Sequence, residues 1–441
     1  MSHNLTPSTS DFWFLPLGGC GEIGMNLNLY GHGGGWLMVD CGVMFDADAV
    51  VMADPQFITE RHEHLAGIIV THAHQDHIGA VVEVWNRCRV PIYTTPFTAF
   101  ILRRSFAEAG FSEVPIVTVN SRETLDIGPF TVRWLPITHS TPETHALLIS
   151  TQAATVLHTA DWKIDRYPVV EPGFDHDQFA LLGQVDAVVC DSTNAISPGT
   201  SVSEGDVRGG LQQVVQQAAG RVVVSCFASN VARLQTLGSI AARCGRYIGV
   251  MGRSLNTMAQ AGRACRYLDD DFRPISVNDL GYLPRNEVLA IASGSQGEPG
   301  AALSRLANDN HPGINLDAGD LVVFSARTIP GNEKAIAALV SRFRDRGIHV
   351  VHADDYELPV HASGHACQDE LASLYRWVKP AIAIPVHGEA EHIAQNAAIA
   401  KRSGVPVQLQ GRNGDLFVIA GAGGPLVRSQ VVDTGRISRS Y

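Results

Sequence analysis

The first half of the chain consists of short, mainly apolar runs separated by glycine-rich or polar turns. Phe12–Leu17 and Trp36–Val39 are runs of this kind, and Met25–Tyr30 alternates apolar with polar residues, which is the period of a strand. Further runs predict strands at Gly67–Val70, Pro91–Thr94, Phe130–Leu135, Thr155–Trp162 and Val185–Cys190. We therefore expect the chain to begin as a β-meander.

The pattern changes near Glu204, where helices and strands begin to alternate. This part predicts helices over Val207–Ala219 and Ser229–Ala242, and strands at Arg221–Cys226, Tyr247–Met251, Val288–Ala292 and Leu321–Ser325. Such alternation is typical of a parallel sheet, whose ligand sites lie at the carboxyl ends of the strands. The last part predicts strands at Ile348–Ala353 and Ala381–Pro385, a helix between them that ends at Trp377, and two short strands within Val407–Arg436.

The composition is that of a globular protein with two or three domains. The chain has 441 residues, of which 45% are hydrophobic and 17% charged. Its net charge of −11 argues against a surface that coats nucleic acid broadly, but is compatible with a local basic channel. The eight cysteines form no C-x-x-C pair, no signal peptide is evident, and no apolar stretch approaches the ~20 residues of a membrane span. We expect a reduced, cytoplasmic protein with no membrane partner.

A glycine-rich stretch follows the first predicted strand. Gly19, Gly21 and Gly24 fit the G-x-G-x-x-G pattern of a dinucleotide-binding loop, with Asp40 downstream. That loop requires a helix after the glycines. Because the strand pattern Met25–Tyr30 follows instead, we reject a dinucleotide site and expect a tight turn at the edge of an active site.

The densest group of metal-ligand residues follows the strand Gly67–Val70. His72, His74, Asp76 and His77 fall within six positions, and Ile78–Trp85 after them has a helical pattern. Imidazole nitrogens and carboxylate oxygens are the usual ligands of zinc and similar ions. His72 and His74 alternate along an extended segment and can reach one ion together. Asp76 and His77 lie past the bend, which suits a second ion.

Three more candidate ligands stand at or after predicted strands. His139 follows Phe130–Leu135 and is a candidate third ligand of the first ion. Asp161 can bridge two ions, and His387 completes the second site. We interpret His158, inside its strand, as structural.

The polar loops of the alternating part are candidate contacts for a phosphate chain. They contain Ser229 and Asn230, Ser295 and Gln296, and the segment 328–333. Taken singly, each of these loops is as readily explained by an ordinary helix N-cap.

With these residues in order, the chain resembles the metallo-β-lactamase superfamily, and within it the β-CASP nucleases and the bacterial ribonuclease J family. Asp191–Thr193, Ser363–His365 and Pro385–Glu389 look like the three additional β-CASP motifs. Other shared stretches are Gly21–Asn26, His158–Asp161, Gly294–Pro299 and Ile329–Glu333.

The chain departs from the family pattern at Ala73 and Gln75, where glycine and glutamate are usual, and at Thr141 and Glu143, where isoleucine and aspartate are common. Neither Ala73 nor Gln75 is a ligand, so we expect metal binding to persist. The similarity ends near Gly435, so we expect the family's C-terminal domain, which takes part in self-association, to be missing. A homodimer is compatible with the family, and the oligomeric state stays open.

The resemblance implies an αββα metallo-β-lactamase sandwich with an inserted β-CASP domain built on a mainly parallel sheet. Together with the change of pattern, it places the first domain at residues 1–203 and 359–441 and the β-CASP domain at 204–358. RNA would lie in the cleft between them, as single strands with a 5′-monophosphate end.

By similarity, His72, His74 and His139 hold one ion; Asp76, His77 and His387 hold another; and Asp161 bridges. Zinc is the expected metal, with Mn²⁺ or Mg²⁺ as alternatives. The implied activity is a ribonuclease, 5′–3′ exonuclease or endonuclease or both, that hydrolyses phosphodiester bonds by metal-activated hydroxide.

The resemblance also assigns roles around the ions. His365 is the candidate general acid, oriented and kept protonated by Asp191, while Asp76 and these two residues form the catalytic set. Ser363 is a candidate phosphate contact. Asp40 is expected to orient a ligand histidine.

Three alternatives stay open at this point. The first is a metal-dependent hydrolase of small esters or lactones, against which the inserted domain argues. The second is a non-catalytic RNA-binding protein, against which the intact ligand positions argue. The third is a nuclease that acts on DNA.

Overall fold

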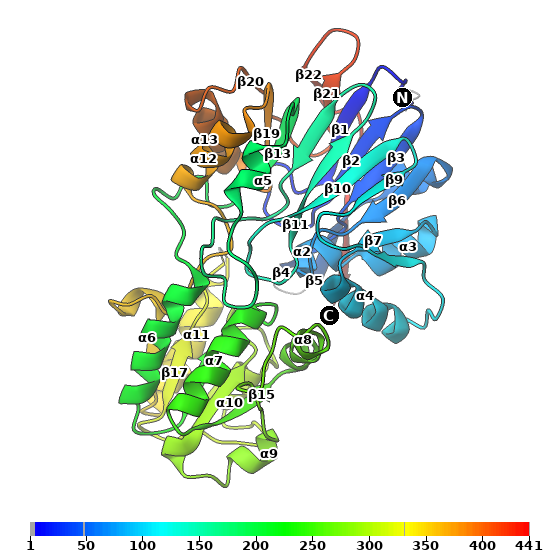
Figure 1. Cartoon of the computed structure of the whole chain (residues 1–441). Coiled ribbons are helices and arrows are strands. Elements are labelled where there is room, and N and C mark those ends of the chain that lie inside the picture. Colours follow the sequence, from blue (N-terminus) through cyan, green and yellow to red (C-terminus); the bar gives the residue numbers. More distant parts are fainter. Residues whose placement is uncertain (1–4, 47–48, 330, 441) are drawn as a thin grey trace.

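Two large mixed sheets pack face to face in one lobe of the molecule, and a smaller parallel sheet forms the other lobe (Figure 1). The structure is a computed structural model that describes residues 5–46, 49–329 and 331–440. The first large sheet runs in the order β22 (Leu426–Arg428), β21 (Leu416–Ala420), β1 (Phe12–Gly18), β2 (Leu27–His32), β3 (Gly35–Val39), β6 (Leu65–Ile69), β7 (Ile92–Thr94) and β8 (Ile116–Thr118).

The second large sheet provides most of the site. Its order is β20 (Val407–Gln408), β19 (Ile382–Val386), β13 (Ala187–Asp191), β12 (Thr155–His158), β11 (His145–Ser150), β10 (Phe130–Pro136) and β9 (Thr124–Ile127). The inner faces of the two sheets bury side chains such as Phe14, Tyr30, Trp134 and Ile384 against one another. This apolar layer is the main core of the lobe, because burial of apolar area drives the packing.

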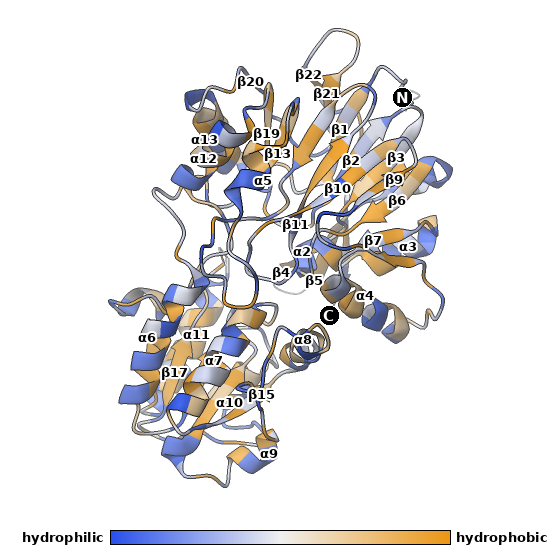
Figure 2. Cartoon of the chain, viewed as in Figure 1, coloured by the Kyte–Doolittle hydropathy of each residue, from blue (hydrophilic) through white to orange (hydrophobic). Residues whose placement is uncertain are grey.

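Helices cover the outer faces of both sheets (Figure 2). On the first sheet, α3 (Val81–Cys88) and α4 (Pro96–Glu108) bury Val84, Trp85 and Phe97. The second sheet is covered by α5 (His176–Ala180), α12 (Gln368–Val378) and α13 (Ala390–Arg402), whose apolar side chains are buried against it. The result is the αββα sandwich expected from the sequence.

The other lobe is an inserted parallel sheet with helices on both faces. Its order is β15 (Tyr247–Met251), β16 (Val288–Ala292), β14 (Val222–Ser225), β17 (Leu321–Phe324) and β18 (His349–His352), with every pair parallel. The helices are α6 (Glu204–Gln217), α7 (Val231–Arg243), α8 (Arg253–Ala264), α9 (Val277–Leu280), α10 (Ala302–Ala307) and α11 (Glu333–Asp345). Both faces of the sheet are covered, as burial of a parallel sheet requires.

A buried ion pair joins α6 and α7 where the chain enters this lobe. Arg233 Nε donates to Glu204 Oε1 at 2.6 Å and Arg233 Nη2 donates to Glu204 Oε2 at 3.0 Å. Arg233 Nη1 also donates to the carbonyl oxygen of Ser325 at 3.0 Å. Both charged side chains are buried, so this network fixes the beginning of the inserted lobe.

The structure differs from the sequence prediction in several places. The helix after the histidine cluster begins earlier, as α2 (Gln75–Ile78), and breaks before α3. Strand β12 ends at His158 rather than running to Trp162. The tail forms four short strands instead of two. The last of them, β23 (Arg436–Ser440), pairs with β5 (Ala49–Ala53), which forms an unpredicted hairpin with β4 (Val43–Asp46). The short helix α1 (Gln56–Thr59) follows this hairpin. Among the described residues, none of the helices combines the length and apolarity of a membrane span.

Candidate metal centre

The candidate ligands gather because several strands end at one edge of the sandwich. Strands β12, β13 and β19 are parallel, and β10 runs in the same direction because it is antiparallel to β11, as β12 is. His139, Asp161 and His387 follow the ends of β10, β12 and β19. His72 and His74 follow β6 of the other sheet and face them.

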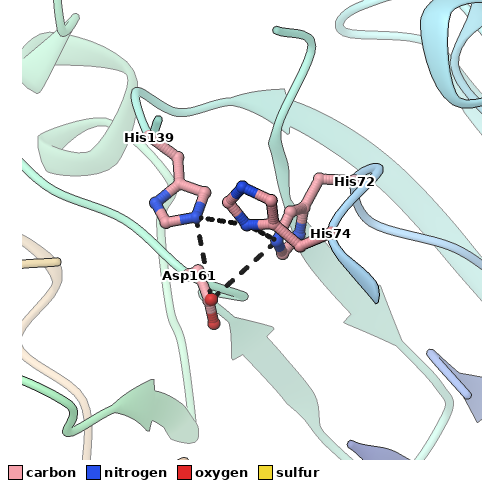
Figure 3. Close-up of side chains that lie close together, drawn as sticks. All are labelled: His72, His74, His139 and Asp161. Atoms are coloured by element: carbon pink, nitrogen blue, oxygen red, sulfur yellow. Dashed lines mark hydrogen bonds and ion pairs between the residues drawn. The ribbon is translucent and has the colours of Figure 1, made fainter. Parts of the chain in front are cut away.

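The first ligand group consists of three histidines and one carboxylate (Figure 3). His74 Nδ1 lies 3.1 Å from His72 Nε2 and 3.0 Å from His139 Nε2. Asp161 Oδ2 lies 3.8 Å from His72 Nε2 and 3.7 Å from His139 Nε2. Four candidate donor atoms therefore face a common point.

The second ligand group shares Asp161 with the first. Asp161 Oδ2 lies 3.3 Å from His77 Nε2, and its Oδ1 lies 2.9 Å from His387 Nδ1. Asp76 Oδ2 lies 3.5 Å from His77 Nε2 and 3.3 Å from His387 Nε2. The left-handed backbone of His387, with φ of 51°, turns its ring from the end of β19 toward this group.

His365 and Asp191 form a third cluster beside the shared carboxylate. His365 Nδ1 donates to Asp191 Oδ2 at 2.8 Å and lies 4.0 Å from Asp161 Oδ2. Asp191 Oδ1 accepts hydrogen bonds from the backbone N–H and the hydroxyl of Thr193, at 2.9 and 2.7 Å. Asp191 is thus fixed on one side and orients the imidazole of His365 on the other.

Other residues fix the orientation of the candidate ligands. Asp40 Oδ2 accepts from His77 Nδ1 at 2.8 Å, as expected from the sequence. His139 Nδ1 donates to the carbonyl oxygen of Gly364 at 2.6 Å. A Cβ atom at position 364 would lie 2.6 Å from the His139 ring, so only glycine permits this contact. His158 Nδ1 lies 2.9 Å from the hydroxyl of Tyr30, and among the described residues His158 belongs to none of the ligand groups.

Burial and charge divide the histidines into two classes. Burial and the neighbouring histidines lower the pKa of His72 and His139 well below the ordinary value, so these rings are neutral at pH 7. Burial lowers the pKa of His77, but the carboxylates of Asp161, Asp76 and Asp40 raise it further, and the net shift is upward. The pKa of His365 is raised in the same way, because Asp191 and Asp161 outweigh its burial.

The donor set fits two divalent cations. In a tetrahedral site with Zn–N bonds of 2.0–2.1 Å, the nitrogen atoms lie about 3.3 Å apart, close to the separations in the first group. His387 Nε2 is buried without a hydrogen-bond partner among the described residues, although Asp76 lies nearby. A cation beside these atoms would satisfy the unpaired nitrogen and the carboxylates together.

The predicted phosphate contacts differ in how far their side chains are already engaged. Ser363 Oγ accepts from Asn194 Nδ2 at 2.8 Å, so its own hydroxyl proton is left to donate. Asn230 caps α7 by accepting from the backbone N–H of Arg233, and Gln296 Nε2 donates to the carbonyl of Arg327. Asn230 therefore acts as a helix N-cap, whereas Gln296 joins its own loop to the loop of Arg327. Ser229 and Ser295 are buried near the same strand ends.

Several residues of the site had not been singled out from the sequence. Asn26 Nδ2 lies 3.1 Å from His77 Nε2, and the Thr71 hydroxyl donates to Asp40 at 2.8 Å. Thr193 lies in the Asp191–Thr193 motif but was given no role of its own, and Asn194 follows directly after that motif. Their position directly after a buried strand was the available signal.

Three family models match consecutive parts of the chain. Residues 24–179 match the metallo-β-lactamase superfamily, residues 219–343 match "Ribonuclease J, beta-CASP domain", and residues 359–410 match "Zn-dependent metallo-hydrolase RNA specificity domain". Their order reproduces the sandwich, the inserted lobe and the return to the sandwich. These matches confirm the resemblance drawn from the motifs.

Similar proteins extend the match over the whole chain. Ribonuclease J of Sinorhizobium meliloti is 41% identical over all of this chain and 79% of its own length. Ribonuclease J of Mycolicibacterium smegmatis is 38% identical over 88% of this chain and 71% of its own length. A crystal structure of a protein of unknown function from Enterococcus faecalis shares the fold, with a TM-score of 0.64 at 15% identity over 92% of this chain and 100% of its own. The chain therefore belongs to the ribonuclease J family of the metallo-β-lactamase superfamily.

Proposed function

We propose that this chain is a metal-dependent ribonuclease that hydrolyses the phosphodiester bonds of RNA. One observation carries the proposal: the Asp161 carboxylate lies between the two ligand groups, with one oxygen 3.3 Å from His77 and the other 2.9 Å from His387. A shared carboxylate between two buried sets of nitrogen and oxygen donors is typical of two-metal hydrolases. The family relationship supports RNA as the substrate.

We assign one ion to His72, His74 and His139 and the other to Asp76, His77 and His387, with Asp161 contacting both. Zinc is the metal that this imidazole-rich donor set favours, and Mn²⁺ and Mg²⁺ are the alternatives to test. When bound, two such ions supply an acidified water molecule and neutralise charge on the scissile phosphate.

The residues around the ions provide the proton chemistry. His365 Nδ1 is held by Asp191, so Nε2 is the atom left to donate a proton to the leaving 3′-oxygen. The raised pKa of His365 favours the protonated ring. The hydroxyl of Ser363 donates to a phosphate oxygen. Cleavage in this way leaves products with a 5′-phosphate and a 3′-hydroxyl.

The substrate we propose is single-stranded RNA with a 5′-monophosphate, bound between the sandwich and the inserted lobe. Ser229 and Ser295 are our candidates for contacts with its phosphates, whereas Asn230 and Gln296 act by fixing their loops. We place the lobe boundaries at residues 203/204 and 358/359. Self-association as a homodimer is a further part of the proposal.

The decisive experiment is digestion of end-labelled RNA by the purified protein, with metal analysis of the same sample. His77→Ala should abolish cleavage and lower the bound metal. His64→Ala, an exposed histidine of the same lobe with a side chain 54% accessible, is the matched control. Wild-type protein that binds divalent metal but leaves RNA intact would overturn the proposal, and faster decay of 5′-monophosphorylated than of 5′-triphosphorylated RNA would support the preferred end.

A further inference from the structure

Asn194 lies between the two lobes and contacts the segment that carries His365. Its side chain is buried, and its Nδ2 donates to Ser363 Oγ at 2.8 Å and to the carbonyl oxygen of His365 at 3.1 Å. The remaining atom of the amide, Oδ1, accepts from Arg327 Nη1 at 3.4 Å. Asn194, which follows β13 of the sandwich, therefore contacts both the Ser363–His365 segment, where the chain returns to the sandwich, and Arg327, which follows β17 of the inserted lobe.

Arg327 belongs to the inserted lobe, and a hydrogen bond fixes its backbone. It follows β17, and its carbonyl oxygen accepts from Gln296 Nε2 at 2.9 Å, so the loop after β16 fixes its backbone. Its side chain is exposed. In the part of the chain that the structure describes, Asn194 Oδ1 is the only hydrogen-bond acceptor of this guanidinium. Most of its N–H groups are free to bind an anion such as a phosphate oxygen.

We propose that Asn194 is a positioning residue that couples the Ser363–His365 segment to Arg327, so that the orientation of His365 depends on the inserted lobe. The inference rests on the proposed ribonuclease function. RNA in the cleft places phosphates beside Arg327. A guanidinium fixed by a phosphate holds the Asn194 amide, and the amide holds the segment of His365 in the position for proton transfer.

An amide suits this position because it offers two donors and an acceptor without charge. Aspartate has nearly the same shape but donates no hydrogen bond when ionised, and it would add a negative charge near Asp191. Asn194→Asp therefore removes the donated hydrogen bonds while leaving the space that the side chain fills nearly unchanged. Asn194→Ala removes both, and Arg327→Gln removes the charge on the other lobe.

The experiment compares these variants on end-labelled single-stranded RNA, with RNA affinity measured in chelator and bound metal measured separately. We expect Asn194→Ala to lower kcat by about 10- to 100-fold, since a misplacement of about 1 Å has such an effect. RNA affinity and metal content should stay within about twofold. Hydrogen exchange in the segment 360–367 should become faster.

The coupling itself is tested by the double variant. Arg327→Gln should lower kcat and weaken RNA binding in the wild-type background, but should not lower kcat further when Asn194 is already alanine. Arg342→Gln is the control, because Arg342 is exposed near the end of α11 and carries the same charge.

Wild-type kcat in Asn194→Asp, or multiplicative losses in the double variant, would overturn the inference. If Asn194→Ala does not fold, the kcat values of Asn194→Asp and Arg327→Gln decide whether the coupling exists. Failure of wild-type protein to cleave RNA would defeat the proposed function and the inference together. Cleavage by wild-type protein and by every Asn194 variant at equal rates would defeat the inference alone.

Discussion

The carboxylate of Asp40 lies 2.8 Å from His77 Nδ1, and both side chains are buried. Asp40 also accepts from the backbone N–H of Thr71 at 2.8 Å and from its hydroxyl at 2.8 Å. Its backbone is left-handed, with φ of 63°. Asp40 thus connects the end of β3 to the loop of the histidine cluster and directs His77 Nε2 toward Asp161.

Asp40→Asn should weaken metal binding at the second ligand group. Asparagine tolerates the left-handed backbone, so the fold should persist, but the neutral amide makes His77 a less basic ligand. We expect metal affinity to fall by about 10- to 100-fold, measured by competition with a chelator. Asp177→Asn, at an exposed carboxylate with a side chain 74% accessible, is the control. Unchanged affinity in Asp40→Asn would contradict this role.

His365→Ala should slow RNA cleavage without removing metal. Loss of a general acid typically lowers the rate by about 10²- to 10⁴-fold. Metal should stay bound, because the His365 ring is hydrogen-bonded to Asp191 and belongs to neither of the two ligand groups. Single-turnover cleavage and metal analysis of the same preparation measure both quantities. A variant that loses its metal would assign His365 to the metal ligands instead.

Glu171 should make the protein less stable as the pH rises. Burial, with the neighbouring Glu143 carboxylate, raises the pKa of Glu171 from its ordinary value of 4.5 to about 7. Between these values the folded state binds more protons than the unfolded state, so the free energy of unfolding falls as pH rises through this window. Below pH 4.5 the destabilising contribution is absent.

Glu171→Gln removes this titration but keeps an acceptor for the backbone N–H of Glu143, which donates to Glu171 Oε1 at 2.8 Å. At pH 8 the variant should be more stable than wild type by on the order of 1–3 kcal/mol, and the difference should vanish near pH 4–5. Urea unfolding at several pH values measures it. Glu108→Gln, at an exposed carboxylate, should show no such trend. A difference that does not depend on pH would contradict the assignment.

Glu204→Ala should destabilise the inserted lobe strongly. The change leaves the Arg233 guanidinium buried without its carboxylate partner, and breaking such a pair costs about 3–5 kcal/mol. Denaturant unfolding measures the loss. Asp270→Ala provides the comparison, because its pair with Arg273 is exposed and should contribute little. Equal stability of the two variants would contradict the importance of the buried network.

Local patterns were sufficient to predict most elements. The strands Tyr247–Met251 and Val288–Ala292 were predicted with the bounds that the structure has, since a buried parallel strand is a short apolar run. The hairpin of β4 and β5 was missed. Its stability depends on pairing with β23, almost 400 residues further along the chain, and no local pattern contains that partner.

The sequence by itself determined the kinds of candidate metal ligand, the positions after strand ends where they stand, and the family. It could do so because ligand chemistry and strand period are properties of neighbouring residues. Only the tertiary structure decided that Asp161 lies between both ligand groups, that Asn230 caps a helix, and that Asn194 joins the His365 segment to Arg327. Those relations depend on strand order and side-chain direction, which arise when segments far apart in the chain pack together.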